Sequence, residues 1–167
     1  MSIAIGDRLP EARLSEFIDT ETPGCTLGPN NFQVSDLVKG KKIVILGVPA
    51  AFSPTCSDDH LPAYIKLADQ FKAKGVDEIW CVAVNDAFVM GAWGLAQKAT
   101  GVVRMMADGS AAFTKALGLE LDLTKAGLGV RSVRYSMLVE DGVISKLNTE
   151  KGVKLDVSGA EQLLAQM

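Results

Sequence analysis

The chain has 167 residues, of which 48% are hydrophobic and 22% are charged, and its formal net charge is −3. This profile predicts a single domain over residues 1–167 with an ordinary hydrophobic core. Lys and Arg residues are scattered, and no apolar run reaches the roughly 20 residues that span a bilayer. We therefore expect neither a nucleic-acid partner nor a membrane partner.

The three cysteines stand far apart, at positions 25, 56 and 81. An odd number at these spacings fits neither a disulfide framework nor a zinc motif. The chain opens without a basic segment followed by an apolar one, so the pattern of a secretory signal is not found. These observations favour a reducing, cytoplasmic environment, and each thiol has to be assessed from its own surroundings.

In chain order, the predicted elements alternate between strands and helices. Residues 19–31 are rich in turn formers and indicate a loop or a loose hairpin. Apolar β-branched runs predict buried strands, and apolar residues at helical spacing predict helices. Asp141-Gly142, between two apolar runs, is the strongest hairpin signal. The expected strands cover residues 41–47, 78–84, 102–108 and the two halves of 134–148, and the expected helices cover 54–75, 87–99, 110–118 and 158–167.

This order, β-α-β-α-β-α-β-β-α, predicts an α/β protein with a mixed central β-sheet flanked by helices. A thioredoxin-like fold has this arrangement, although the order alone also fits other α/β sandwiches. Two details of the helices are expected as well. Ser158 is a candidate cap for the last helix, with Glu161 three residues on, and Pro62 is expected to kink the helix that follows Cys56.

The segment VPAAFSPTCSDDHLP, residues 48–62, joins a buried strand to a helix and carries Cys56. In open α/β sheets, sites form at the carboxyl ends of strands. The first turn of the helix that follows offers free N–H groups and the positive end of its dipole, and both favour a thiolate over a thiol. Cys56 is therefore the candidate nucleophile, and an inert structural cysteine is the alternative.

The residues expected around Cys56 have more than one interpretation. His60 follows it by four residues, so the pair could share a metal ion, but two ligands do not close a site and we expect no metal. We interpret His60 as a structural, hydrogen-bonding residue. A thiolate also needs a cation, and Arg131 and Arg134, where the predicted hairpin starts, are both candidates that spacing does not separate.

Several separated motifs resemble the type II peroxiredoxins, a branch of the thioredoxin-like superfamily. VPAAFSPTC fits the peroxiredoxin pattern of Pro, three residues, Thr or Ser, two residues and Cys, with Pro49, Ser53 and Cys56 in the patterned positions. The stretches GVDEIWCVAVNDAFVMGAW, ADGSAAFTKALGLELDL and GLGVRSVRYSMLVEDG follow in the order of that family. The resemblance covers the chain from about residue 38 to its end.

The resemblance implies a peroxidase without a cofactor, which reduces hydrogen peroxide and organic hydroperoxides through a sulfenic acid on Cys56. It implies that the Ser53 hydroxyl holds the peroxide, that Pro49 shields the pocket and that Arg134 is the catalytic arginine. The implied role is antioxidant defence and redox homeostasis. Ala50 and Ser53 depart from the Gly and Thr of many relatives, but serine keeps the hydroxyl, so we expect activity to survive.

The sequence leaves open which thiol restores Cys56. Cys81 matches the second cysteine of plant type II forms, where it is often assigned as resolving, but its apolar neighbours predict burial and a raised pKa. The C-terminal cysteine of animal forms is absent. We favour an external thiol, glutathione with glutaredoxin or else thioredoxin, over a Cys56–Cys81 disulfide. Cys25 matches nothing in the family pattern and is either a bystander or a secondary redox site.

Two other classes of function are considered. A thioredoxin-like disulfide oxidoreductase usually uses C-x-x-C, and Cys56 has no second cysteine at that spacing. A peroxide sensor or redox relay would use the same reactive thiol, and the sequence is compatible with it as an additional role.

The resemblance also implies a homodimer, because the family often pairs through loops around the active site. In this chain those loops are the Phe52 region, residues 85–93 and the loop before Arg131. Phe88 and Trp93 are candidates for such an interface, and each is equally a candidate for the core.

Overall fold

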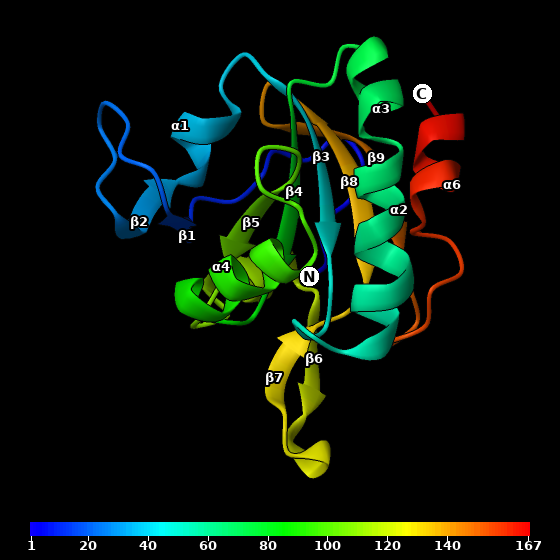
Figure 1. Cartoon of the computed structure of the whole chain (residues 1–167). Helices are drawn as coiled ribbons and strands as arrows, with labels where there is room; N and C mark the ends of the chain where they lie inside the picture. The colour runs from blue at the N-terminus through cyan, green and yellow to red at the C-terminus, as the bar shows by residue number, and fades with distance from the viewer.

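A seven-stranded sheet is the centre of the computed structural model, which describes all 167 residues (Figure 1). Its strand order is β2-β1-β5-β4-β3-β8-β9, and a separate two-stranded hairpin, β6–β7, projects from the body. β3, β4 and β5 are parallel, and the outer pairings are antiparallel. The strands are β1 (Arg13–Ile18), β2 (Gly28–Gln33), β3 (Lys42–Gly47), β4 (Glu78–Ala83), β5 (Arg104–Ala107), β6 (Glu120–Leu123), β7 (Gly129–Ser132), β8 (Tyr135–Glu140) and β9 (Val143–Thr149).

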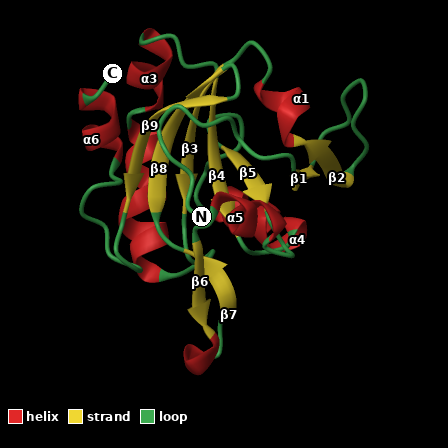
Figure 2. Ribbon diagram, turned by 180° about the vertical axis from the view of Figure 1, so that it is seen from behind, coloured by secondary structure: helices red, strands yellow, loops and turns green.

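Helices cover both faces of the sheet. Figure 1 shows α2, α3, α4 and α6 on the near side, and α1 and α5 are best seen from behind in Figure 2. The α-helices are α1 (Val34–Val38), α2 (Leu61–Lys66), α3 (Ala68–Ala73), α4 (Ala87–Ala96), α5 (Ala112–Leu117) and α6 (Ala160–Ala165). A π-helical turn, η1 (Cys56–His60), precedes α2, and a 3₁₀ turn, η2 (Thr124–Ala126), joins β6 to β7. No helix is long and apolar enough to cross a membrane.

Two apolar clusters fill the space between the sheet and the helices, one on each face. Successive side chains of a strand point to opposite faces, so β3 contributes to both clusters. Val44 and Leu46 join the cluster beneath α2, α3, α4 and α6, while Ile43 and Ile45 join the cluster beneath α1 and α5. This explains why β3 is apolar along its whole length rather than alternating.

The mixed sheet with helices on both faces confirms the expected thioredoxin-like fold. The predicted hairpin around Asp141-Gly142 is β8–β9, and the turn-rich segment after residue 18 is the connection of the β1–β2 hairpin. The sequence analysis did not identify the β6–β7 hairpin. Its short strands carry little of the apolar pattern that marks a buried strand, because most of their residues are exposed or half-buried.

The expected cap at the last helix is wrong. α6 begins at Ala160, its N-cap is Gly159, and no side chain caps it. Ser158 lies one residue too early for that role. An N-cap hydroxyl accepts from a helix N–H, whereas the Ser158 hydroxyl donates a hydrogen bond of 2.8 Å to Glu150 Oε1, which also accepts from Ser158 N at 2.8 Å.

The helix that follows Cys56 is irregular where Pro62 predicted a disturbance. Residues Cys56–His60 form a wider π turn, and the α-helical pattern resumes at Leu61. Proline has no N–H to donate to the carbonyl four residues earlier, so the regular ladder cannot run through this segment. Short π segments are often found at functional sites, which makes this turn relevant to Cys56.

Candidate active site

The site begins where β3 ends. Gly47 is the last residue of β3, and a Cβ at this position would collide with the ring of Tyr135. A glycine is therefore needed for β8 to approach the end of β3, and this approach brings the start of β8 next to the segment that carries Cys56. Gly47 pairs with Tyr135, so Arg134 lies at the same edge of the sheet as the loop after β3.

Cys56 is fully buried at the first turn of the helix, and its sulfur receives a hydrogen bond from Arg134 Nη2 at 3.3 Å. The backbone around it provides further donors. Ser57 N donates to Ser53 O at 2.9 Å, whereas the N–H groups of Thr55 and Cys56 have no backbone acceptor. A guanidinium and free N–H groups therefore meet at one thiol, which is an arrangement suited to an anion.

Arg134 is almost fully buried, with 2% of its surface exposed, and hydrogen bonds hold it on several sides. Its Nε donates to Val153 O at 3.1 Å and its backbone N donates to Gly152 O at 3.3 Å. Its carbonyl accepts from Glu150 N at 2.9 Å. The loop after β9 thus fixes the guanidinium that contacts Cys56.

The two arginines that the sequence left equivalent are separated by the fold. Arg134 contacts Cys56, as described above. Arg131 lies on β7, where its Nε donates to Leu128 O at 2.7 Å and its Nη1 donates to Val84 O at 3.2 Å. Arg131 therefore ties the β6–β7 hairpin to the loop after β4 rather than meeting the thiol.

His60 links Arg134 to the segment before α6. Its Nε2 lies 3.0 Å from Ser158 O and its Nδ1 lies 2.9 Å from Arg134 Nη1. A carbonyl only accepts and a guanidinium only donates, so Nε2 carries the proton and Nδ1 accepts. The ring is neutral, and its burial together with the Arg134 charge lowers the pKa of His60 to about 4. The predicted hydrogen-bonding role of His60 agrees with these contacts.

The loop between β3 and the helix is closed by its own hydrogen bonds. Ser53 Oγ donates to Ala50 O at 2.8 Å, and Ala51 N donates to Asn85 Oδ1 at 3.0 Å. Pro49 is buried in this loop. Phe52 has a left-handed backbone with φ of 63° and exposes 55% of its surface. Such a conformation in a bulky residue is strained and is typical of functional loops.

The other two cysteines lie in different surroundings. Cys81 is fully buried in β4, where its strand neighbours are Leu46 of β3 and Met105 of β5. Burial raises the pKa of this thiol well above its usual value. Cys25 is half-buried in the β1–β2 connection, where its N donates to Thr22 O at 3.0 Å. The structure brings neither thiol into hydrogen-bonding contact with Cys56.

The sequence analysis missed Glu150, Tyr64 and Asn85. Glu150 is only 6% exposed and accepts hydrogen bonds from the backbone of residues 156–158. Tyr64 donates to Ser158 O at 2.8 Å. One signal was available: Tyr64 is four residues after His60 on the same helix, so both side chains lie on one face. No comparable signal marks Glu150, because its partners come from a loop without a motif.

These features define a class of protein. A thioredoxin-like fold presents a single thiol at a strand-to-helix junction, with an arginine hydrogen-bonded to the sulfur. This is the site of a thiol-based redox enzyme that works without a second cysteine in a C-x-x-C motif.

Comparison with known proteins identifies the family. The Redoxin family model matches residues 4–164. Peroxiredoxin-2C from Oryza sativa subsp. japonica is 44% identical over 162 residues, which cover 97% of this chain and 96% of the relative. Peroxiredoxin-2B from Arabidopsis thaliana is also 44% identical with the same coverage. The chain belongs to the Redoxin family and, within it, to the type II peroxiredoxins, which are thiol-dependent peroxidases of antioxidant defence.

Solved structures agree with this assignment. The crystal structure of reduced Prx3 in complex with H₂O₂ from Vibrio vulnificus has a TM-score of 0.90 and 51% identity, covering 98% of each chain. A crystal structure described as a putative thioredoxin reductase from Burkholderia cenocepacia has a TM-score of 0.99 and 56% identity, covering 100% of this chain and 99% of that chain. Two structures with the same fold are thus described as different proteins, a peroxiredoxin and a putative thioredoxin reductase. The single thiol at this site, without a C-x-x-C motif, fits the peroxidase.

Proposed function

We propose that Cys56 is the peroxidatic cysteine and that Arg134 is its catalytic partner. The contact of 3.3 Å between Arg134 Nη2 and Cys56 Sγ is the observation that supports this proposal most strongly. Pro49 and Ser53 complete the proposed site: Pro49 shields it, and the Ser53 hydroxyl, now bonded to Ala50 O, turns to the peroxide when it binds. The substrates are hydrogen peroxide and alkyl hydroperoxides.

The first step is an in-line displacement at oxygen. The Cys56 thiolate attacks the terminal oxygen of the peroxide, a sulfur–oxygen bond forms and the oxygen–oxygen bond breaks. The attacked oxygen keeps its hydrogen, so the products are a sulfenic acid on Cys56 and an alkoxide or hydroxide that takes a proton from water. Arg134 and the free N–H groups of Thr55 and Cys56 stabilise the negative charge that moves onto the leaving oxygen.

The second step needs another thiol. We propose that glutathione with glutaredoxin, or thioredoxin, attacks the sulfenic sulfur of Cys56, which releases water and forms a mixed disulfide that a second thiol reduces. Cys81 is a poor candidate, because burial raises its pKa and its strand holds it on both sides. Because Cys56 is fully buried, a reductant can reach its sulfur only if the first turn of the helix opens. We expect this opening at the π turn Cys56–His60.

Three single variants test this assignment. Cys56→Ser should abolish peroxide consumption, with a loss of at least about 10³-fold, because no other thiol is activated. Cys81→Ser and Cys25→Ser are the matched controls. Steady turnover with glutathione and glutaredoxin should persist in both. Loss of turnover in Cys81→Ser, while the first equivalent of peroxide is still consumed, would instead assign Cys81 as the resolving residue.

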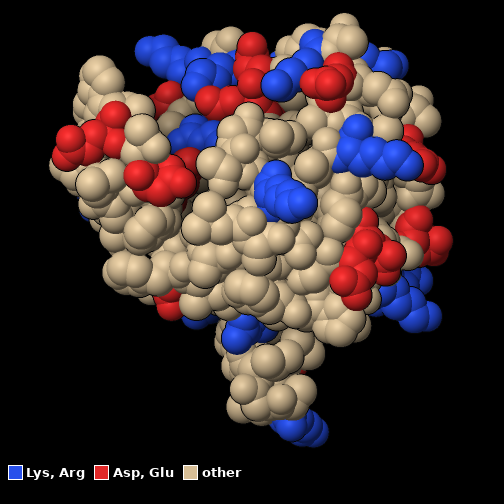
Figure 3. Space-filling view, viewed as in Figure 1, with Lys and Arg blue, Asp and Glu red and all other residues tan.

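We also propose a homodimer that pairs through loops beside the site. Three segments carry exposed apolar residues: Phe52 is 55% exposed, Phe88 65% and Leu128 41%. Hydrogen bonds connect these segments, since Ala51 N bonds Asn85 and Arg131 bonds Val84 O. In Figure 3 the visible face of the projecting hairpin is mostly uncharged between basic side chains at its base and at its tip, which leaves an area suited to an apolar contact. Trp93, the other candidate, is fully buried and belongs to the core.

Sedimentation velocity distinguishes a dimer from a monomer. Phe88→Asp should shift the protein toward monomer, since a charge at an apolar interface is costly. Leu27→Asp is the matched control, because Leu27 is 59% exposed but lies in the distant β1–β2 connection. Equal sedimentation of both variants and the parent as monomers would refute the proposed dimer.

We further propose a cytoplasmic location. Three free thiols suit a reducing compartment. Relatives are described as chloroplastic and as mitochondrial, so the family works in several compartments. Fractionation of cells of the source organism, with the protein detected by antibody, tests the assignment.

A further inference from the structure

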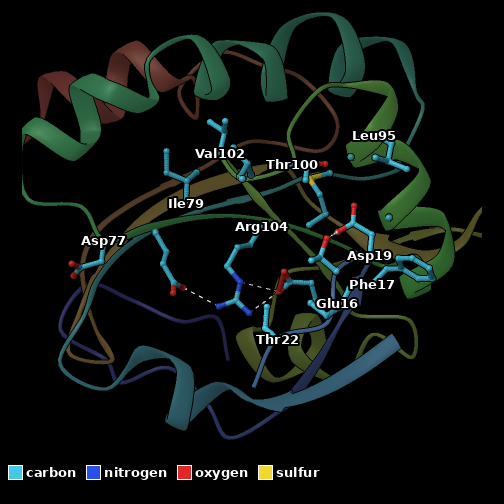
Figure 4. A pocket seen from close by; sticks show the side chains of 18 of the residues that line it. Glu16, Phe17, Asp19, Thr22, Asp77, Ile79, Leu95, Thr100, Val102 and Arg104 are labelled. Carbon is cyan, nitrogen blue, oxygen red and sulfur yellow. Dashed lines mark hydrogen bonds and ion pairs between the residues drawn. The ribbon is translucent and has the colours of Figure 1, made fainter. Parts of the chain in front are cut away.

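A pocket that catalysis does not use lies at the opposite end of the sheet from Cys56 (Figure 4). We call it the Arg104 pocket. It has a volume of about 460 Å³, which lies within the range of small-molecule sites. The first residues of β4 and β5 line it, whereas Cys56 follows the carboxyl end of β3, a strand parallel to both. The end of β1 and the second half of α4 complete the wall.

Apolar side chains form part of the pocket wall, and its charged groups are mainly acidic. Figure 4 shows Phe17, Ile79 and Val102 around the cavity, with Leu95 at its edge. Glycines at 91 and 94 allow α4 to lie against β1 and β5, since a Cβ there would collide with Phe17 and Met105. The charged lining residues are Glu16, Asp19, Asp77 and Glu78 against Lys72 and Arg104.

Ion pairs with Glu16 and Glu78 balance the charge of Arg104, and some carboxylate oxygens in the pocket remain without a donor. Its Nε and Nη2 contact Glu16 Oε2 at 2.8 and 2.6 Å, and its Nη1 contacts Glu78 Oε2 at 3.1 Å. The other oxygen of Glu16 makes no hydrogen bond. Asp19 receives only a long contact of 3.4 Å from the Thr20 hydroxyl. Two acidic groups at the end of β1 therefore retain acceptor capacity.

The helix beside the pocket adds to its negative potential. α4 has ten residues, and Leu95 in its last turn lines the cavity, so the carboxyl-terminal end of the helix dipole lies at this wall. No group of three or more His, Cys, Asp or Glu residues is arranged for a metal ion. The apolar part of the wall also disfavours a hydrated inorganic cation.

We propose that the Arg104 pocket binds an amphipathic organic cation, with an apolar chain between α4 and the sheet and an ammonium group at Glu16 and Asp19. Two-dimensional NMR of the full chain with hexylammonium chloride tests this. Hexanol and hexanoate are the matched probes, since they share the chain but differ in charge. Millimolar hexylammonium should shift amide signals of residues 16–20 and 94–104, and hexanoate should not.

Variants sharpen the test. Asp19→Asn should weaken hexylammonium binding about three- to fivefold, as expected for one partly exposed charge pair. Asp36→Asn, an exposed acid on α1, is the control and should not change it. Any of three results would overturn the proposal. Hexanol could bind as tightly as hexylammonium, the amide signals could shift only around Cys56, or Asp19→Asn could bind hexylammonium as tightly as the parent does.

The carboxylate of Glu150 gathers hydrogen bonds from the segment that precedes α6. One oxygen, Glu150 Oε1, accepts from the backbone N of Asp156, Val157 and Ser158 at 2.7, 2.6 and 2.8 Å, and from Ser158 Oγ at 2.8 Å. Ser158 O in turn accepts from His60, whose other nitrogen receives Arg134 Nη1. A continuous chain of hydrogen bonds therefore runs from Glu150 to the guanidinium at Cys56.

We infer that Glu150 is a positioning residue for Arg134, acting through Ser158 and His60, an inference that rests on the proposed role of Arg134 at Cys56. Glu150→Ala should slow the reaction of Cys56 with hydrogen peroxide about tenfold, as misplacement of a catalytic group does. Glu150→Gln keeps an acceptor oxygen and should restore most of the rate.

Glu161→Ala, an exposed acid on α6, is the control for loss of a nearby negative charge. Thermal unfolding of all variants separates stability from positioning. A Glu150→Ala protein that unfolds at a lower temperature but keeps the parent rate would show a structural role only, and would overturn the inference. Equal loss in Glu150→Gln and Glu150→Ala would overturn it as well.

Discussion

Cys56 and Cys81 are equally buried, yet their surroundings differ in the feature that matters for reactivity. Both are fully inaccessible and belong to the same apolar cluster. Cys56 stands where a strand gives way to a helix, and Arg134 donates to its sulfur. Cys81 stands in mid-strand between Leu46 and Met105, and burial raises its pKa. The presence of a cation and free N–H donors, rather than burial, separates the two thiols.

Apart from the loss of Cys56 itself, the largest effect on this contrast should come from Arg134. Replacing it as Arg134→Lys keeps a positive charge but removes the planar fork that reaches Cys56 and His60 together. We expect the rate constant with hydrogen peroxide to fall about 10²-fold, as for loss of a donor that stabilises developing charge. Stopped-flow fluorescence measures it. Arg131→Lys is the control, because Arg131 contacts only carbonyls, and a similar loss there would contradict the assignment.

A smaller effect is expected from the hydroxyl of Ser53. Ser53→Ala removes the hydroxyl that we propose turns from Ala50 O to the peroxide, and the rate should fall about tenfold, in line with one hydrogen bond to a charged group. Ser53→Thr keeps the hydroxyl and should stay near the parent rate. Competition kinetics against a reference peroxidase compare the three proteins. A Ser53→Ala rate equal to that of the parent would remove Ser53 from the site.

Acid should weaken the fold through His60. Its pKa is about 4 in the fold against an ordinary 6.5, so the unfolded chain binds the proton more readily between these values. The stabilisation is complete above pH 6.5 and is lost as the pH falls toward 4, by up to about 3 kcal/mol. The lowered pKa of Glu150 acts in the same direction, since its backbone hydrogen bonds favour the carboxylate.

Urea unfolding between pH 7 and 4 measures this loss. The variant His60→Gln cannot take up the proton, so its free energy of unfolding should fall less steeply over the same range. Parallel curves for the parent and the variant would mean that other groups carry the acid sensitivity.

The smallest effect should come from Cys81. Cys81→Ala removes only a sulfur from an apolar site, so peroxidase turnover should stay within about twofold and stability should fall by about 1 kcal/mol. Alkylation of the reduced parent, followed by peptide mass spectrometry, gives the complementary result: Cys56 is modified in the folded protein and Cys81 only after unfolding. Rapid modification of Cys81 in the folded protein would contradict the expected difference in reactivity between the two thiols.

Much of the fold could be predicted because its signals are local. Apolar runs indicated β3, β4 and β5, and Asp141-Gly142 indicated the β8–β9 hairpin. The β6–β7 hairpin was missed because its strands are short and largely exposed. The cap assigned to Ser158 failed because α6 begins at Ala160 with Gly159 as its N-cap, while Ser158 is tied to Glu150. Glu150 is eight residues earlier, but the loop between them carries no motif that would reveal the contact.

The sequence by itself indicated the candidate nucleophile, since the junction between a buried strand and a helix marks Cys56, and the resemblance to the family motif adds Pro49 and Ser53 as candidates. Only the tertiary structure decided which arginine meets that thiol. β8 pairs with β3, Gly47 lets Tyr135 approach, and Arg134 arrives at Cys56 while Arg131 turns to Val84. The reason is physical: motifs report local backbone and side-chain chemistry, whereas the cation, His60 and Glu150 meet only when the sheet register brings distant segments together.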